Sequence, residues 1–124
     1  MQSTTLGITR TVKDTVRVPF EAMARASLPK GYQLSLVICG DTLAQRMNAE
    51  YRKKTYKPNV LSFPLAKLEG EIFLNIRKAQ REARAMRIPL NTRLAHLFVH
   101  GCTEGKCAPP LAFSDVRPFS TRHY

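Results

Sequence analysis

The spacing of hydrophobic residues along the chain predicts an alternation of short strands and helices. Alternating or β-branched stretches predict strands, and apolar residues three or four positions apart predict amphipathic helices. Strands are expected at residues 5–12, 32–39, 59–65 and 70–75. Helices are expected at residues 19–27, 76–87 and 93–101, and from the residue after Asp41 or Thr42 to about residue 54. The order β-α-β-α-β-β-α-α predicts an α/β (α+β) domain in which helices pack on a small mixed sheet of about four strands.

Local signals indicate where several of these elements begin and how they are placed. Asp41 or Thr42 is expected to cap the second helix, and Asn91 or Thr92 the last one, because short polar side chains can accept a hydrogen bond from the first helical turn. Pro64 has no backbone N–H to donate, so the third strand is expected at an edge of the sheet.

The last helix and the residues after it differ sharply in character. The helix is apolar almost all round, which predicts that it is buried, and Gly101 predicts its end. The residues beyond lack any periodicity and contain Pro109, Pro110 and Pro118, which break helices. A single domain is therefore expected over residues 1–102, followed by an irregular tail over residues 103–124.

The charge balance indicates an anionic partner. The chain has 20 Lys and Arg against 9 Asp and Glu, a net charge of +11, which favours nucleic acid, a ribosome or an acidic membrane as the partner. No apolar run approaches the roughly 18 residues that a membrane span needs. Three cysteines without a recognisable secretory signal predict a reduced, cytoplasmic protein, with Cys39 in the core.

Two basic surfaces follow from the helical pattern. The third helix has an apolar stripe made of Ile76, Ala79, Ala83 and Met86. The candidate nucleic-acid-binding residues are those at the end of the second helix and on the outer face of the third: Lys53, Lys54, Lys57, Arg77, Lys78, Arg81 and Arg84. Tyr51 and Tyr56 are available to stack on bases. The alternative is that these charges form an ordinary solvated face.

His96 and His100 are the most informative residues for chemistry. They are four positions apart on a predicted helix, so that their imidazoles project from one face and could bind one transition metal. The alternative is two core histidines hydrogen-bonded to backbone carbonyls. Leu97 follows His96 where a zinc protease motif has glutamate, so a protease of that type is excluded.

Three segments together resemble the YbeY family. NAEYRKKTYKPNVLSFPL resembles the family's Asn-x-x-Tyr-Arg and Thr-Asp-Val-Leu-Ser-Phe-Pro block, and GEIFLN resembles its Gly-Asp-Ile strand. LAHLFVHGC resembles the helix and first residues of its histidine signature. The three segments occur in the family's order with similar spacing, and the resemblance is good from about Leu34 to Cys102.

The resemblance implies a YbeY-like metallohydrolase fold and a metal-dependent, single-strand-specific endoribonuclease in rRNA maturation and ribosome quality control. Its partners would be RNA and the ribosome or a ribosomal protein. One zinc ion, held by three histidines of the signature, would activate water. His100 matches the first zinc histidine, Arg52 the arginine of the site, and Ser62 and Phe63 the strand that lines the cleft. His96 matches a position one turn earlier that is not counted as a ligand.

The sequence departs from the family pattern after Cys102. Glu104 stands at the position of the second zinc histidine and Pro110 at that of the third. One explanation is a divergent metal site in which His96 and His100 are joined by Glu104 or Cys107, since carboxylates and thiolates also bind zinc. Two glycines, however, predict that the helix ends before Glu104.

The other explanation, which we favour at this point, is a change of reading frame near residue 102 that leaves a truncated relative with a foreign tail. The competing function is then a catalytically inactive basic module that binds RNA or the ribosome.

Overall fold

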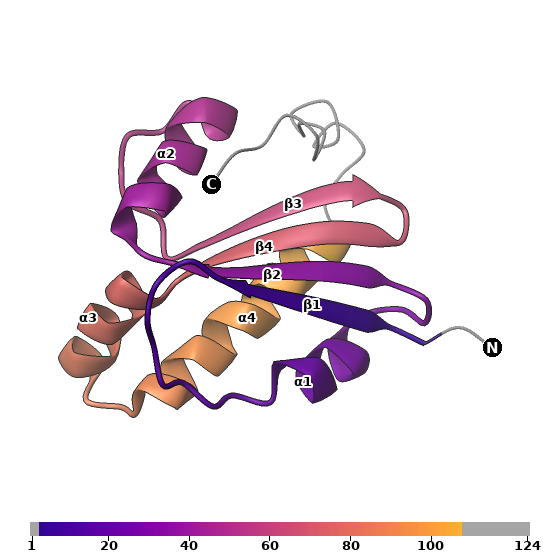
Figure 1. The fold of residues 1–124 in the computed structure, drawn as a ribbon, viewed down its shortest axis with the longest axis horizontal. Coiled ribbons are helices and arrows are strands. Elements are labelled where there is room, and N and C mark those ends of the chain that lie inside the picture. Colours follow the sequence, from indigo (N-terminus) through magenta and orange to yellow (C-terminus); the bar gives the residue numbers. More distant parts are fainter. Residues whose placement is uncertain (1–2, 108–124) are drawn as a thin grey trace.

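The computed structural model of the chain describes residues 3–107 and shows one sheet with helices on both faces (Figure 1). Its elements are β1 (Thr5–Arg10), α1 (Phe20–Ser27), β2 (Gln33–Cys39), α2 (Asp41–Arg52), β3 (Val60–Ala66), β4 (Glu69–Asn75), α3 (Ile76–Met86) and α4 (Leu90–Cys107). The predicted order of strands and helices and the α/β fold class are confirmed.

The sheet is mixed and has the strand order β1-β2-β4-β3. β1, β2 and β4 run parallel, and β3 runs antiparallel to β4. β3 is therefore an edge strand, as its proline predicts. Pro64 lies opposite Gly70, and an irregularity in the register follows between Pro64 and Ala66.

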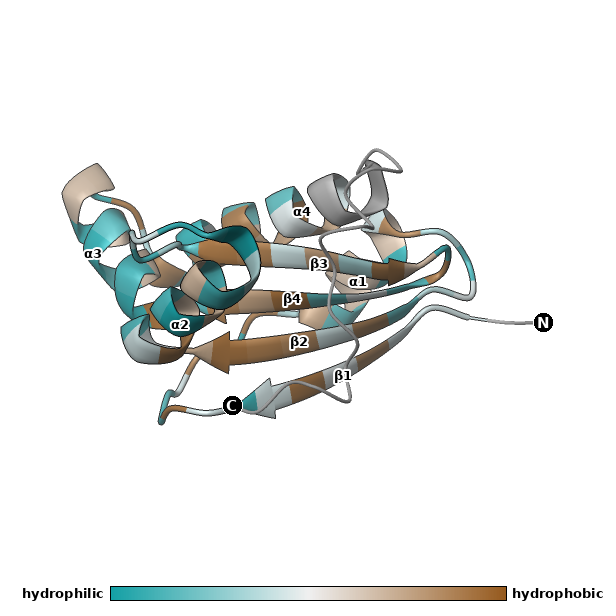
Figure 2. Ribbon diagram, turned by 90° about the horizontal axis from the view of Figure 1, so that it is seen from above, coloured by the Kyte–Doolittle hydropathy of each residue, from teal (hydrophilic) through white to brown (hydrophobic). Residues whose placement is uncertain are grey.

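The sheet separates two hydrophobic cores. The larger core lies between the sheet and α1, α3 and α4, and the smaller core lies between the sheet and α2. In Figure 2 the hydrophobic colouring is strongest along β2, β3 and β4, whereas α2 and α3 contain many hydrophilic residues. Cys39 is fully buried in the smaller core, as expected, and burial raises the pKa of its thiol to about 12.

α4 is buried on one face only, so the prediction of a fully buried helix is wrong. Its buried side chains are Leu94, Leu97, Phe98 and Cys102. His96, Val99 and His100 face outward, because a helix that lies across one face of a sheet leaves its other side to solvent.

α4 also extends to Cys107, so the predicted end at Gly101 and the irregular structure expected for residues 103–107 are wrong. A Cβ atom at Gly101 would lie 3.1 Å from Val60 Cγ2 and 3.3 Å from Ile72 Cδ1. The glycine therefore lets α4 approach β3 and β4 closely instead of ending the helix. Ser62 strengthens this contact by donating a hydrogen bond to the Gly101 carbonyl. Residues 108–124 lie outside the described part of the chain.

The predicted helix caps are wrong as well. α2 is preceded by Gly40, whose position has no side-chain cap, and Asp41 is already helical. α4 begins at Leu90, which places Asn91 and Thr92 inside its first turn. The last residue of the predicted stripe on α3, Met86, is 50% exposed, because it lies at the end of the helix.

Candidate nucleic-acid interface and metal ligands

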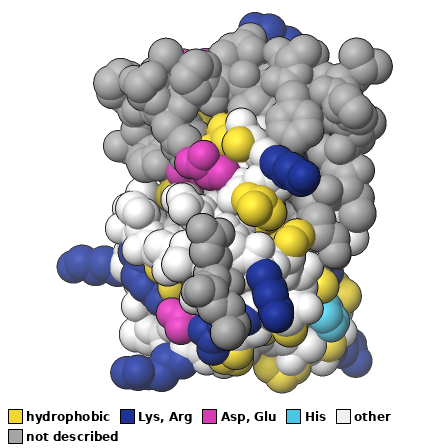
Figure 3. Space-filling model, turned by 90° about the vertical axis from the view of Figure 1, so that its right-hand side faces the viewer, with side chains coloured by type: hydrophobic (Ala, Val, Ile, Leu, Met, Phe, Trp, Pro, Cys, Tyr) yellow, Lys and Arg dark blue, Asp and Glu magenta, His cyan; other side chains and the backbone are white. Residues whose placement is uncertain are grey.

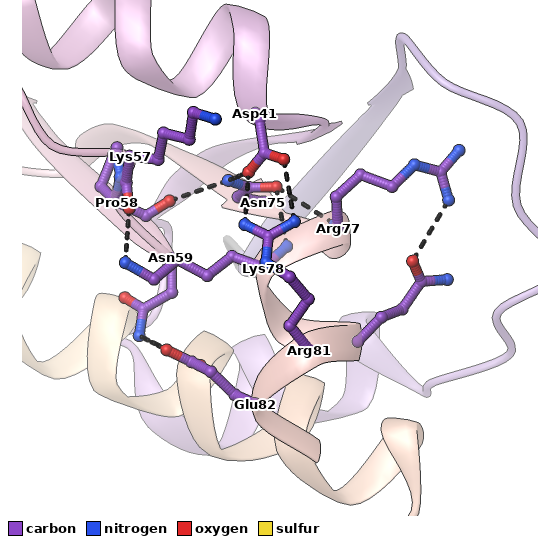
Figure 4. Close-up of polar contacts among 10 residues, drawn as sticks. Asp41, Lys57, Pro58, Asn59, Asn75, Arg77, Lys78, Arg81 and Glu82 are labelled. Atoms are coloured by element: carbon purple, nitrogen blue, oxygen red, sulfur yellow. Dashed lines mark hydrogen bonds and ion pairs between the residues drawn. The ribbon is translucent and has the colours of Figure 1, made fainter. Parts of the chain in front are cut away.

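A buried asparagine organises the polar end of the sheet (Figure 4). Asn75 ends β4, and its Oδ1 caps α3 by accepting hydrogen bonds from the backbone N–H groups of Arg77 and Lys78. Its Nδ2 donates to Asp41 Oδ1 at 2.9 Å and to the Pro58 carbonyl at 3.0 Å. One side chain therefore ties together β4, α3, the start of α2 and the segment before β3. Sequence analysis missed this residue, although asparagine directly before a helix is a recognised capping signal.

Asp41 receives a bidentate contact from Arg81. The two guanidinium nitrogens lie 2.9 and 2.8 Å from its carboxylate oxygens. These hydrogen bonds from Arg81, with a further one from Asn75, lower the pKa of Asp41 from 3.8 to about 2. Arg81 was predicted to bind nucleic acid, but the structure places its charge against a carboxylate of the same chain.

Acid is expected to weaken the fold through this pair. Because the folded-state pKa of Asp41 lies below its ordinary value of 3.8, the contribution to stability is complete above that pH and is lost as the pH falls toward 2. The free energy of unfolding, measured with urea between pH 6 and pH 2, tests this. At pH 6 Asp41→Asn should be less stable than the unmodified chain, and at pH 2 the two should be nearly equal. An equal gap at both ends of the range would contradict the assignment.

Lys57, Lys78 and Tyr56 form a second cluster beside this one. Lys78 Nζ donates to the Lys57 carbonyl at 2.6 Å and lies 5.9 Å from the centre of the Tyr56 ring. Arg77 is engaged with Gln80 and with the Lys13 carbonyl, each at 3.3 Å. The structure thus brings part of both predicted basic surfaces onto one end of the molecule. At the other end, viewed in Figure 3, basic side chains are interspersed with hydrophobic and uncharged ones.

The two tyrosines predicted to be available for stacking differ in environment. Tyr51 is half-buried and packs edge-on against Phe63 at the margin of the smaller core, with ring centres 6.0 Å apart. Less of the Tyr51 ring is therefore open to solvent than of the Tyr56 ring, and base stacking by Tyr51 stays a prediction. Tyr56 is 51% exposed.

Arg52 and His100 come from opposite sides of the sheet. Arg52 is the exposed last residue of α2, followed by Lys53 in the left-handed conformation (φ 57°) and by Lys54. His100 and His96 lie on the exposed face of α4. Both helices contact β3, the edge strand that lies between them.

The strand predicted to line the cleft lies next to the end of α4. Ser62 is half-buried and faces α4, whereas Phe63 is buried against Phe73 in the smaller core. Ser62 and Phe63 both contribute to a small pocket that also includes Gly101 and Cys102. Arg84, the remaining predicted RNA-binding residue, is exposed on α3.

The described residues do not form a complete zinc site. Among residues 3–103, whose side chains the structure describes, no group of three His, Cys, Asp or Glu is placed to hold a metal ion. His96 and His100 supply at most two imidazoles, whereas a catalytic zinc ion usually has three protein ligands. The backbone carries Glu104 one turn beyond His100, and Pro110 lies outside the described residues.

Among the helices described for residues 3–107, none has the length and hydrophobicity that crossing a membrane requires.

Comparison with known proteins identifies the family. The family model described as Endoribonuclease YbeY matches residues 1–103. The chain belongs to the YbeY family. The match ends at the point where the resemblance in the sequence ends, and it extends the resemblance back to the first residue. Membership of the YbeY family, expected from the three quoted segments, is confirmed.

Several relatives are named Endoribonuclease YbeY. The one from Ehrlichia canis is 38% identical over 73 residues, which cover 55% of this chain and 47% of the relative. The one from Methylobacillus flagellatus is 39% identical over 85 residues, which cover 66% of this chain and 57% of the relative. This YbeY chain therefore spans about half the length of the relatives it matches.

The solution structure of TM1509 from Thermotoga maritima has the same fold. It aligns with a TM-score of 0.61 at 15% identity, over 90% of this chain and 83% of that protein. At this identity the likeness concerns the fold alone.

Proposed function

We propose that this chain is an endoribonuclease that cleaves single-stranded RNA in rRNA maturation and ribosome quality control. The match of the YbeY family model to residues 1–103 carries this proposal, because that range contains Arg52, His100 and the predicted basic residues. We further propose that it acts in the cytoplasm, together with the ribosome or a ribosomal protein.

In the proposed reaction the basic residues position the RNA. Lysine and arginine side chains bind backbone phosphates without reading sequence. Lys53, Lys54 and Lys57 are exposed at the end of α2 and in the segment after it, and would contact the strand there. The planar guanidinium of Arg52 can bind two phosphate oxygens at once and offset the negative charge that develops during hydrolysis.

His100 is proposed as a ligand of one zinc ion. A bound zinc ion would supply Lewis acidity and an activated water. Because no group of three metal ligands lies among the side chains described for residues 3–103, the set would have to be completed by residues from 104 onward. Elemental analysis of purified protein should find about one zinc per chain and none in His100→Ala. A zinc content unchanged by that substitution would overturn the role of His100.

Cleavage of a labelled single-stranded RNA tests the activity. Arg52→Ala and His100→Ala should each lower the cleavage rate by about 100-fold or more, because charge stabilisation of a transition state is commonly worth that much. Both residues are exposed, so circular dichroism should show the fold unchanged.

An exposed arginine on another helix serves as a control. Arg25→Ala removes an exposed arginine from α1 and should retain cleavage. Cleavage that persists in Arg52→Ala or His100→Ala would overturn the site. RNA binding that survives chelation, with no cleavage by the unmodified chain, would instead identify an inactive RNA-binding module.

A further inference from the structure

The segment between α2 and β3 is held in place by hydrogen bonds from neighbouring elements to its backbone carbonyls. Five consecutive carbonyl oxygens in it each accept a hydrogen bond from a neighbouring element. The donors are Gln45 Nε2 to Thr55 (3.1 Å), Asn48 Nδ2 to Tyr56 (3.0 Å), Lys78 Nζ to Lys57 (2.6 Å), Asn75 Nδ2 to Pro58 (3.0 Å) and the Asn75 backbone N–H to Asn59 (2.8 Å). The conformation of the segment is thus set from α2 on one side and from β4 and α3 on the other.

This segment presents one aromatic side chain to solvent. Tyr56 is 51% exposed, whereas Asn48, which holds its carbonyl, is fully buried. The Lys78 ammonium lies over the Tyr56 ring at 5.9 Å from its centre, within the range of a cation–π contact. An exposed tyrosine beside lysines is typical of proteins that bind single-stranded nucleic acid by stacking.

We propose that Tyr56 is a platform on which one unpaired base of single-stranded RNA stacks, while phosphates beside that base contact Lys57 and Lys78. This proposal rests on the proposed function and assigns a substrate-binding subsite to it. The base would stack on the ring face opposite Lys78. Because hydrogen bonds hold the loop before RNA binds, ordering it on binding would cost little conformational entropy.

The subsite would also select for single strands. A base in a duplex is already stacked on its neighbours and paired, so it cannot lie on an exposed ring without being extruded. Lysine contacts to phosphate alone would not make this distinction, because they are available on either form.

Binding of a short labelled single-stranded RNA, measured with a chelator present to prevent cleavage, tests the subsite. Tyr56→Ala should weaken binding by about 5- to 150-fold, the range that corresponds to one stacked base. Tyr56→Phe should bind like the unmodified chain, because the ring and not the hydroxyl makes the contact. Met86→Ala removes a side chain of similar exposure from the end of α3 and should leave binding unchanged.

A fluorescent variant reports on stacking directly. The chain has no tryptophan, so Tyr56→Trp places a single one at the subsite, and its emission should be quenched by single-stranded RNA and not by a duplex. A set of RNAs, each with an abasic residue at a different position, locates the stacked base. At one position the abasic residue should weaken binding to the unmodified chain. The same RNA should bind Tyr56→Ala no more weakly than the intact RNA does.

The outcomes separate the subsite from the function. The subsite would be overturned if the unmodified chain and Tyr56→Ala bound RNA with equal affinity and RNA did not quench the emission of Tyr56→Trp. The proposed function would then still stand. A folded, unmodified chain that binds no RNA would overturn the proposed function, and the subsite with it.

Discussion

Replacing Phe98 by alanine is expected to lower the free energy of unfolding by about 3–5 kcal/mol. Phe98 is fully buried in the larger core, and its ring lies 5.0 Å from that of Phe20. The substitution removes the aromatic contact between α4 and α1 and leaves a cavity that surrounding side chains fill only in part. Small domains have about 5–15 kcal/mol of total stability, so the loss is a large share of it.

Urea unfolding followed by circular dichroism measures this effect. Val99→Ala is the matched control, because Val99 is the next residue on α4 and is 40% exposed. It should change the free energy of unfolding by less than about 0.5 kcal/mol. A loss below about 1 kcal/mol for Phe98→Ala would show that α4 does not depend on this packing.

Replacing Asn75 by alanine is expected to cost about 2–4 kcal/mol of folding stability. The substitution removes the cap of α3, and it leaves the buried Pro58 carbonyl without the hydrogen bond that Nδ2 donates. The same nitrogen also contacts Asp41, so the junction between α2 and α3 is weakened. Since the side chain is fully buried, water cannot replace these contacts without a rearrangement.

Asn91→Ala is the matched control for this prediction. Asn91 is exposed in the first turn of α4, at the position where sequence alone expects a cap. Its substitution should change the free energy of unfolding by less than about 0.5 kcal/mol. Equal effects of the two substitutions in the same urea titration would contradict the role assigned to Asn75.

Only part of the candidate site could be predicted from the sequence, and the reason is physical. Family motifs locate Arg52 and His100 in the chain, but whether charges remain available to RNA depends on distant partners. Arg81 is paired with Asp41, which lies 40 positions earlier. No local pattern contains such a pairing, so Arg81 and the exposed Lys57 were indistinguishable from the sequence.

The order and type of the elements were determined by the sequence itself, because hydrophobic periodicity and the missing N–H of Pro64 are local properties that survive in the folded chain. The family was also readable, from short motifs in fixed order. Only the tertiary structure decided the rest. It showed that Gly101 lies inside α4 and does not end the helix. The glycine lets α4 pack closely against β3 and β4. The tertiary structure also packed Tyr51 partly buried against the smaller core and left Tyr56 on the surface, because side-chain exposure depends on which elements pack together and not on residue type.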